Sequence, residues 1–194
     1  ISSVEETSRY KFLSKKDLFD VEYWSLEQAK LNKAKKELQG NVVVITGSTG
    51  EIGKATYKLF KKYGAEVVLL DINKSKINDL QTKISDLCIH CDVTDKQSVK
   101  KAFNKILEIY GGVDIFIANA GVAGEIQSIV DYDEEVFDSV MAVNAKGPFL
   151  GLKAVIPALN ERGGGSVVIT SSVAGVTGAS LLSPYVMSKH AVVG

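Results

Sequence analysis

Short apolar runs alternate with amphipathic segments along the chain from Asn41 onward. The apolar runs are rich in β-branched residues, which is typical of strands buried on both faces of a parallel sheet; they span residues 41–47, 66–71, 86–93, 113–121 and 163–172. The segments between them have apolar residues at helical spacing; they span residues 52–63, 74–83, 95–110 and 133–159. This alternation predicts a Rossmann-type, doubly wound parallel sheet with helices on both faces, a three-layer α/β/α fold.

Residues 1–40 differ from the rest because they are polar and rich in lysine. A helix is predicted from about Ser25, because Ser25 and Gln28 have the spacing of a capping box. An aromatic cluster near it is costly to leave in water, so we expect it to dock on this domain or on a neighbour; it consists of Phe19, Tyr23 and Trp24. The pattern predicts a linker or helical extension over residues 1–40 and a Rossmann domain over residues 41–194.

Composition and charge exclude several classes of partner. Hydrophobic residues make up 45% of the 194 residues, so a sizeable core can form. Lys plus Arg equals Asp plus Glu, at 23 each, which gives no electrostatic reason to expect nucleic acid or an anionic membrane as a partner. No apolar run approaches the length of a membrane span, and the first residues lack the apolar block of a signal peptide. With two cysteines there is no disulfide framework, so we expect a cytoplasmic protein.

The two cysteines, Cys88 and Cys91, lie in a predicted strand. Alternate residues of a strand point to opposite faces of the sheet, so these two thiols are predicted to face apart rather than share a metal ion. The sequence also lacks a second pair that would complete four ligands. We therefore expect two small buried side chains and no metal site.

A glycine-rich segment, TGSTGEIG over residues 46–53, lies between a predicted strand and a predicted helix. A dinucleotide pyrophosphate needs close approach of the backbone without Cβ atoms in the way, and it needs the free N–H groups of a helix N-terminus. The strand, the helix and an acidic residue at the end of the next strand are all present, as the motif requires. We predict a cofactor-binding loop, the alternative being a simple tight turn; it consists of Gly47, Ser48, Thr49, Gly50, Glu51, Ile52 and Gly53.

Asp71 ends the next predicted strand, 18 positions after Gly53. A carboxylate there can accept hydrogen bonds from the adenosine ribose hydroxyls and would repel the 2′-phosphate of NADP. The residue therefore favours NAD over NADP. Alternatively, Asp71 caps the helix that begins near Asn73, and both functions can hold together.

Four further motifs follow the loop: ANAG (118–121), Asn144 in VMAVNAKGPF, SSVAG (171–175) and YVMSK (185–189). Together with TGSTGEIG, their order and spacing resemble those of the short-chain dehydrogenase/reductase family, over about Asn41 to Gly194. The resemblance implies NAD-dependent interconversion of an alcohol and a carbonyl compound, with a small molecule as substrate. It also implies a homodimer or homotetramer, paired through the helices that hold Asn144 and Tyr185.

Tyr185 and Lys189 are four residues apart, so on a helix they share a face. A nearby ammonium stabilises tyrosinate and lowers the pKa of the tyrosine from its reference value of about 10, so Tyr185 can act as acid or base near neutral pH. The alternative is an ordinary amphipathic helix with an exposed lysine. By resemblance, Tyr185 exchanges the proton with the substrate oxygen, and Lys189 also holds the nicotinamide ribose.

The resemblance assigns the remaining site residues. Ser172, rather than Ser171, would hydrogen-bond the substrate oxygen, because the family's serine lies three residues before a glycine, here Gly175. Asn144 is similar to the helix-kink asparagine that positions a proton-relay water. Asp92, followed by Val93, is similar to the residue that contacts the adenine ring. The segment that steadies the central sheet and lines the cofactor cleft is Asn119, Ala120 and Gly121.

The chain departs from the family pattern in two places. Position 51 is Glu where the common loop has Gly, and the glycines instead fit TGxxGxxG, so a charged side chain is expected near the pyrophosphate. The chain ends at Gly194, within the helix of Tyr185, whereas family members continue through two more strands. We therefore expect the sheet and the substrate pocket to be incomplete and the 194-residue polypeptide alone to be inactive. A non-catalytic nucleotide-binding or assembly module is the alternative function.

The segment FDVEYWSLEQAKL (19–31) resembles a linker found in bifunctional bacterial proteins. In those proteins a class II aldolase domain precedes a short-chain dehydrogenase domain, as in the rhamnulose-1-phosphate aldolase/lactaldehyde dehydrogenases. The resemblance implies a fused aldolase domain upstream of residue 1, which would hold the aldolase zinc site. It also implies lactaldehyde or a similar small hydroxy-aldehyde as substrate.

Overall fold

The computed structural model describes residues 36–193 of the chain. The predicted helix from Ser25 and the aromatic cluster of Phe19, Tyr23 and Trp24 lie outside the described residues, as does nearly all of the predicted 1–40 extension.

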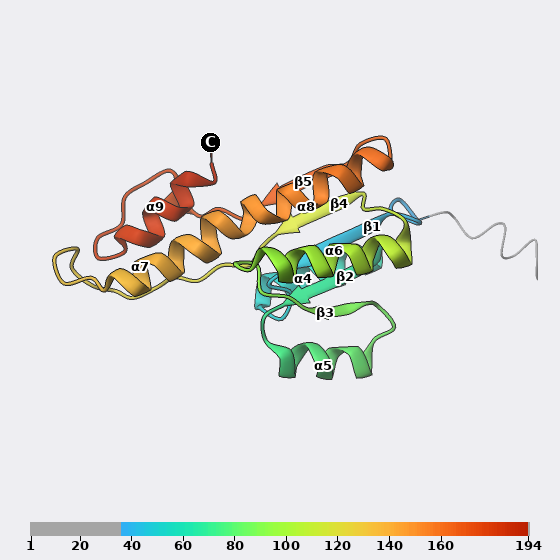
Figure 1. The fold of residues 1–194 in the computed structure, drawn as a ribbon, viewed down its shortest axis with the longest axis horizontal. Coiled ribbons are helices and arrows are strands. Elements are labelled where there is room, and N and C mark those ends of the chain that lie inside the picture. Colours follow the sequence, from blue (N-terminus) through green and yellow to red (C-terminus); the bar gives the residue numbers. More distant parts are fainter. Residues whose placement is uncertain (1–35, 194) are drawn as a thin grey trace, which may run out of the picture. The chain divides into compact units, whose positions relative to one another are not determined.

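The centre of the fold is a five-stranded parallel sheet in the order β3-β2-β1-β4-β5 (Figure 1). The strands are β1 (Val42–Thr46), β2 (Glu66–Asp71), β3 (Cys88–His90), β4 (Ile115–Ala118) and β5 (Ser166–Ile169). All five residues of β1 are buried, as are five of the six in β2. The continuous apolar runs therefore arise because both faces of these strands are covered. The predicted α/β fold class is confirmed.

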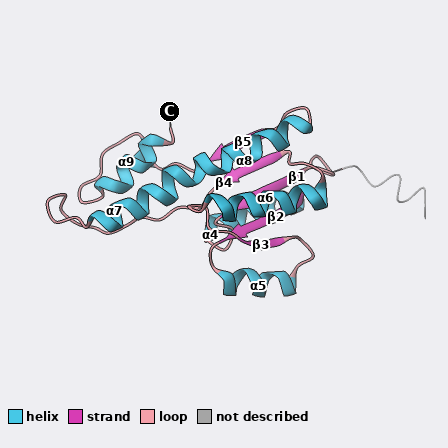
Figure 2. Cartoon of the chain, viewed as in Figure 1, coloured by secondary structure: helices cyan, strands magenta, loops and turns pink. Residues whose placement is uncertain are grey.

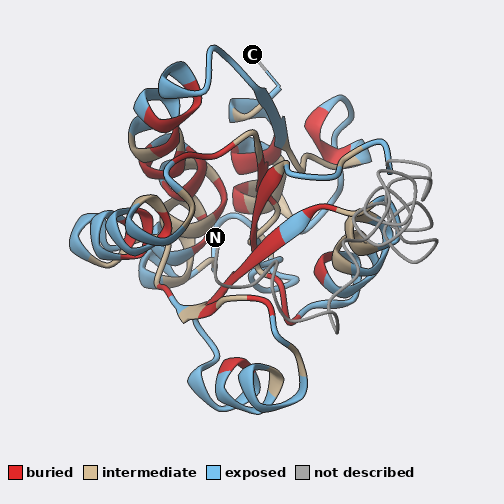
Figure 3. Ribbon diagram, turned by 90° about the vertical axis from the view of Figure 1, so that its right-hand side faces the viewer, coloured by how far each residue is buried: buried red, intermediate tan, exposed pale blue. Residues whose placement is uncertain are grey.

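Helices cover the two faces of the sheet (Figure 2). They are α4 (Glu51–Lys62), α5 (Lys74–Lys83), α6 (Lys96–Tyr110) and α8 (Gly147–Glu161). Two further helices, α7 (Glu134–Met141) and α9 (Ser183–Ala191), lie beyond the end of the sheet. One core cluster joins the sheet to α6 and α8 through residues such as Phe103 and Val155. The other joins it to α4 and α5 through residues such as Phe60 and Ile77. Figure 3 shows the buried residues along the strands and on the inward sides of the helices.

The long helix predicted over residues 133–159 is interrupted. α7 is followed by a π-helical turn (Ala142–Lys146), in which the N–H of Gly147 bonds the carbonyl of Ala142, and α8 continues from there. Pro148 has no N–H, so it cannot donate to the carbonyl of Asn144, which an α-helix would pair with it. The sequence therefore contains the reason for the break, and the π-turn holds Asn144. α7 lies beside α9 (Figure 1).

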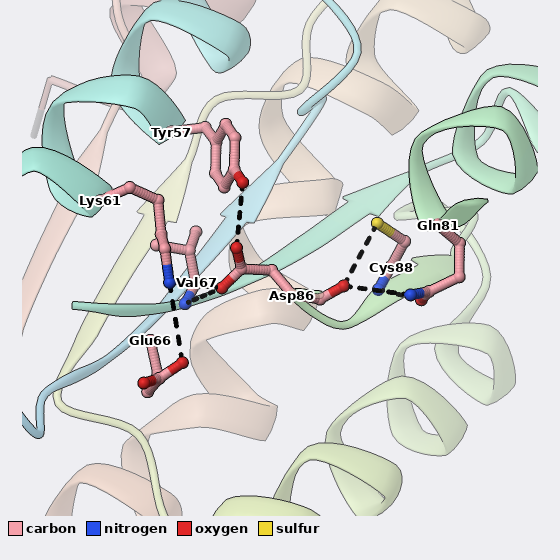
Figure 4. A network of polar contacts seen from close by, with 7 residues as sticks. All are labelled: Tyr57, Lys61, Glu66, Val67, Gln81, Asp86 and Cys88. Atoms are coloured by element: carbon pink, nitrogen blue, oxygen red, sulfur yellow. Dashed lines mark hydrogen bonds and ion pairs between the residues drawn. The ribbon is translucent and has the colours of Figure 1, made fainter. Parts of the chain in front are cut away.

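A buried carboxylate, Asp86, fastens α4 to the sheet (Figure 4). It accepts hydrogen bonds from the Tyr57 hydroxyl at 2.9 Å, the Lys61 ammonium at 2.8 Å and the N–H of Val67 at 3.3 Å. Burial, followed by the hydrogen bond to Asp86, raises the pKa of Tyr57 to about 12. Because α4 begins in the glycine-rich loop, the bonds of Asp86 to this helix also help to hold the loop in place.

Cys88 and Cys91 belong to different core clusters and so lie on opposite faces of the sheet, as their spacing predicts. Burial raises the pKa of each thiol to about 11. Among residues 36–193, none of the helices combines the length and apolar character that a membrane crossing requires.

Candidate active site

The carboxyl ends of the strands surround a cleft of about 620 Å³. β1 is the point where the strand order changes direction, since β2 lies on one side of it and β4 on the other. Ligands of open α/β sheets bind at such a switch point. The cleft is lined by Gly47, Gly50, Glu51, Ile52, Asp71, Ile72, Cys91, Asp92, Val93, Thr94, Asn119, Ala120, Gly121, Val122 and Val143.

Most of the residues predicted to bind a cofactor line this cleft. Ser48, Thr49 and Gly53 do not line it. Tyr185 and Lys189 lie on α9 and also do not line it. Sequence reasoning missed five lining residues, and each directly follows or precedes a predicted site residue along the chain; they are Ile72, Cys91, Thr94, Val122 and Val143.

At two positions of the glycine-rich loop, Gly47 and Gly53, there is no space for a side chain. Gly47 has φ +63°, and a methyl group on it would lie 2.7 Å from the Cα of Ala120. A methyl group on Gly53 would lie 2.5 Å from the carbonyl oxygen of Gly47 and 2.7 Å from the Cα of Ser48. α4 therefore packs directly on the turn. Gly50, which precedes α4, has no side chain to cap the helix, so the first N–H groups of α4 can bond an anionic ligand.

Glu51 is the first residue of α4 and lies at the edge of the cleft. Its side chain is 92% exposed and pairs with Lys54 at 2.8 Å. The hydrogen bond and the charge of Lys54 lower the pKa of this carboxyl. Glu51 therefore brings a carboxylate to the edge of the cleft, and a neighbouring ammonium accompanies it.

Asp71 is buried at the end of β2, and both of its carboxylate oxygens accept backbone hydrogen bonds. One accepts the N–H of Thr49 at 2.9 Å, and the other accepts the N–H of Asn73 at 2.9 Å. The cap of α5 is Asn73, whose side chain accepts the N–H of Lys76. The alternative that Asp71 itself caps α5 is therefore wrong. Asp71 instead ties the end of β2 to the glycine-rich loop.

Side chains also connect the ends of β1 and β4. The Thr46 hydroxyl oxygen accepts the N–H groups of Asn119 at 3.0 Å and Ala120 at 3.1 Å. The Asn119 amide donates to the carbonyls of Thr46 at 3.1 Å and Gly47 at 3.2 Å. Asp92, which also lines the cleft, accepts the N–H and hydroxyl of Thr94, each at 2.8 Å. These bonds fix the shape of the cleft.

A second polar cluster lies on α9. The helix brings the Lys189 ammonium to 5.8 Å from the centre of the Tyr185 ring. Lys189 is 5% exposed and donates to the carbonyl of Thr170 at 2.7 Å. Burial lowers the pKa of this lysine. The alternative of an ordinary helix with an exposed lysine is therefore wrong, because the ammonium is held inside the protein beside the phenol ring.

The two adjacent serines after β5 have different contacts. The Ser171 hydroxyl donates to the carbonyl of Lys189 at 3.0 Å. The Ser172 hydroxyl accepts the N–H of Ala174 at 3.2 Å, so its own proton can be donated to another group. The contacts of Ser171 therefore hold α9 in place, and Ser172 is the better placed of the two to bond a substrate oxygen.

Asn144 is buried, and its side chain bonds both the N–H and the carbonyl of Val122, each at 2.8 Å. Its amide also donates to the Ser188 hydroxyl at 3.0 Å. A methyl group on Gly121 would lie 3.3 Å from the Asn144 side-chain oxygen and 3.5 Å from the Lys189 nitrogen. Since Gly121 lines the cleft, the asparagine and the lysine lie directly behind this part of its wall.

Comparison with known proteins agrees with this geometry. Residues 41–194 match a family model described as short chain dehydrogenase. Residues 1–31 match a model described as the second domain of class II aldolases. A (+)-cis,cis-nepetalactol synthase from Nepeta racemosa is 39% identical over 166 residues, covering 82% of this chain and 62% of that protein.

Two solved structures have the same fold. NAD⁺-bound xylitol dehydrogenase is 30% identical with a TM-score of 0.77, covering 81% of this chain and 63% of that one. Levodione reductase is 34% identical with a TM-score of 0.74, covering 81% of this chain and 64% of that one. The chain thus spans under two thirds of the length of these relatives. With its family match from Asn41 to Gly194, a glycine-rich loop at a strand-order switch point and a tyrosine–lysine pair on one helix, the chain belongs to the short-chain dehydrogenase/reductase family.

Proposed function

We propose that the protein is an NAD-dependent oxidoreductase that interconverts an alcohol and a carbonyl compound. The observation that carries this proposal is the buried Lys189 ammonium beside Tyr185, next to the wall of a nucleotide-sized cleft. Lysines are almost never fully buried unless they are paired, and a perturbed ionisable group beside a cleft is a candidate for a functional site. A bound nicotinamide cofactor would supply the hydride transfer.

The chain's own groups would handle the proton and the substrate oxygen. Tyr185 gives a proton to the carbonyl oxygen in reduction and takes it from the alcohol in oxidation. Lys189 stabilises the resulting tyrosinate, and Ser172 donates a hydrogen bond to the same substrate oxygen. The carbonyl of Asn144, which Pro148 cannot pair with, is suited to hold the water of a proton relay. Asn144 itself is fixed by Val122.

The loop and the strand ends would bind the cofactor. The N-terminus of α4 offers N–H groups to the pyrophosphate, and Asp71 faces the cleft with a carboxylate that favours the ribose of NAD over the phosphate of NADP. One solved relative is described as NAD⁺-bound, which supports this choice. Asp92 and Val93 line the cleft where the adenine ring would lie.

The substrate we propose is lactaldehyde or a similar small hydroxy-aldehyde. The match of residues 1–31 to a class II aldolase model supports a fused aldolase domain, whose product would be such an aldehyde. We also propose a homodimer or homotetramer, as the family resemblance implies.

The proposal is tested with Tyr185→Phe in the full-length protein. We expect NAD⁺-dependent turnover of lactaldehyde and of other small alcohols to fall by about 10²–10⁴-fold, because the acid–base group is lost. NADH binding, followed by fluorescence, should not change. Tyr63→Phe, at the end of α4, is the matched control. Unchanged turnover in Tyr185→Phe would refute the catalytic assignment and would favour a non-catalytic nucleotide-binding module.

A further inference from the structure

Ser188 lies on α9 between the two proposed catalytic residues and is fully buried, with 0% of its surface exposed. Its hydroxyl donates to the carbonyl of Tyr185 at 2.8 Å and accepts the amide of Asn144 at 3.0 Å. A buried hydroxyl is unfavourable unless it is hydrogen-bonded, and here both its proton and a lone pair are used.

Serines inside helices often bond the carbonyl three or four residues earlier, so the bond to Tyr185 alone indicates no special role. The bond from Asn144 is different, because it crosses from the π-turn to α9. The same Asn144 amide group also donates to the carbonyl of Val122, so both of its hydrogens are used. Ser188 therefore joins α9 to the segment that follows β4.

This connection matters because the two proposed parts of the site are on different elements. Val122 and Val143 line the cleft, whereas Tyr185 is carried by α9. A shift of α9 would move Tyr185 and Lys189 together, relative to the cleft. Reaction rates are sensitive to such a shift, and a displacement of about 1 Å can cost about 10²-fold in rate.

We propose that Ser188 is a positioning residue: it fixes α9 against the Asn144 turn and so sets the place of Tyr185 relative to the bound cofactor. The assignment rests on the proposed function. Ser188 itself neither gives nor takes the substrate proton.

The test compares Ser188→Ala, Ser188→Thr and the matched control Ser183→Ala, each in the full-length protein. Ser188→Ala leaves one Asn144 hydrogen without its acceptor. We expect kcat for NAD⁺-dependent oxidation of small alcohols to fall about 10- to 100-fold, with the dissociation constant of NADH unchanged. Threonine keeps a hydroxyl oxygen that can accept the Asn144 amide and a proton that can bond the earlier carbonyl. Ser188→Thr should therefore recover most of kcat, and Ser183→Ala should equal the wild type.

Hydrogen–deuterium exchange gives a readout that does not depend on turnover. In Ser188→Ala we expect exchange to quicken about 2- to 10-fold, the effect of one lost hydrogen bond, in α9 and around Val122, with α4, α5 and α6 unchanged. Exchange that quickens equally in all helices, or an unchanged kcat, would overturn the positioning role. A wild-type protein that binds NADH but turns over no substrate would refute the proposed function instead, and the exchange pattern would then decide alone whether Ser188 holds α9.

Discussion

Replacing Asp71 with asparagine keeps the size of the side chain and removes its charge. Both carboxylate oxygens now accept backbone N–H groups, from Thr49 and Asn73. An amide offers one oxygen and one NH₂ group, so one of these N–H groups would face another donor. A buried donor without a partner costs about 1–3 kcal/mol. We expect the free energy of unfolding to fall by about this amount, and NADH binding to weaken because the Thr49 N–H shapes the loop.

The charge itself should act on the choice of cofactor. Two unit charges 4 Å apart repel by about 1 kcal/mol in water and by about 4 kcal/mol at an effective dielectric constant of 20. Removing the carboxylate charge of Asp71 should therefore improve the ratio of NADPH to NADH affinity by at least about fivefold. Any distortion of the loop weakens both nucleotides alike and cancels in this ratio.

The assay is a fluorescence titration of wild type and Asp71→Asn with NADH and with NADPH, together with urea unfolding of both proteins. Asp79→Asn is the charge control, because Asp79 pairs with Lys83 on the exposed side of α5. The control should leave the ratio of affinities unchanged. A folded Asp71→Asn protein with the wild-type ratio would show that Asp71 does not select the cofactor.

Two further changes have expected outcomes. Gly53→Ala places a methyl group 2.5 Å from the backbone of Gly47. The free energy of unfolding, measured with urea, should therefore fall by about 1–3 kcal/mol, and NADH binding should weaken. A wild-type affinity for NADH in this variant would contradict the close packing of α4 on the loop. The pKa of Tyr57 is raised to about 12 from 10.0, so its contribution to stability is complete below pH 10.0 and is lost as the pH rises toward 12. Between pH 10 and pH 12, the free energy of unfolding measured with urea should therefore fall less in Tyr57→Phe than in the wild type. An equal fall in both proteins would contradict the raised pKa of Tyr57.

Strands β1 and β2 were predictable because burial on both faces gives a continuous apolar run in the sequence. The run 66–71 coincides with β2, whose side chains all pack inside except that of Glu66. The run 86–93 is longer than β3, which ends at His90. Asp86 precedes this strand, and its side chain bonds Tyr57 and Lys61. The spacing of apolar residues in the sequence does not predict such a polar contact.

The sequence predicts most residues of the candidate site but not the hydrogen bonds between them. Most of the cleft-lining residues belong to short motifs, which are recognised by the spacing of residues along the chain. The bonds that organise them join distant positions: Asn144 and Ser188 are separated by 44 residues, and Thr49 and Asp71 by 22. Neither bond follows from local spacing. The dual attachment of Asp71 and the role of Ser188 therefore required the structure.

The N–H groups of Asn119 and Ala120 donate to the Thr46 hydroxyl oxygen across 73 and 74 residues of the chain. Contacts between such distant positions form only after the loop between them has closed, and they slow folding. The part of the cleft lined by Asn119 and Ala120 should then form late in folding, once β1 and β4 have paired. A nucleotide that binds only the finished cleft stabilises the folded chain by RT ln(1 + [L]/Kd). Because unfolded chains are removed by proteolysis, the cofactor concentration in the cell would influence how long the protein survives.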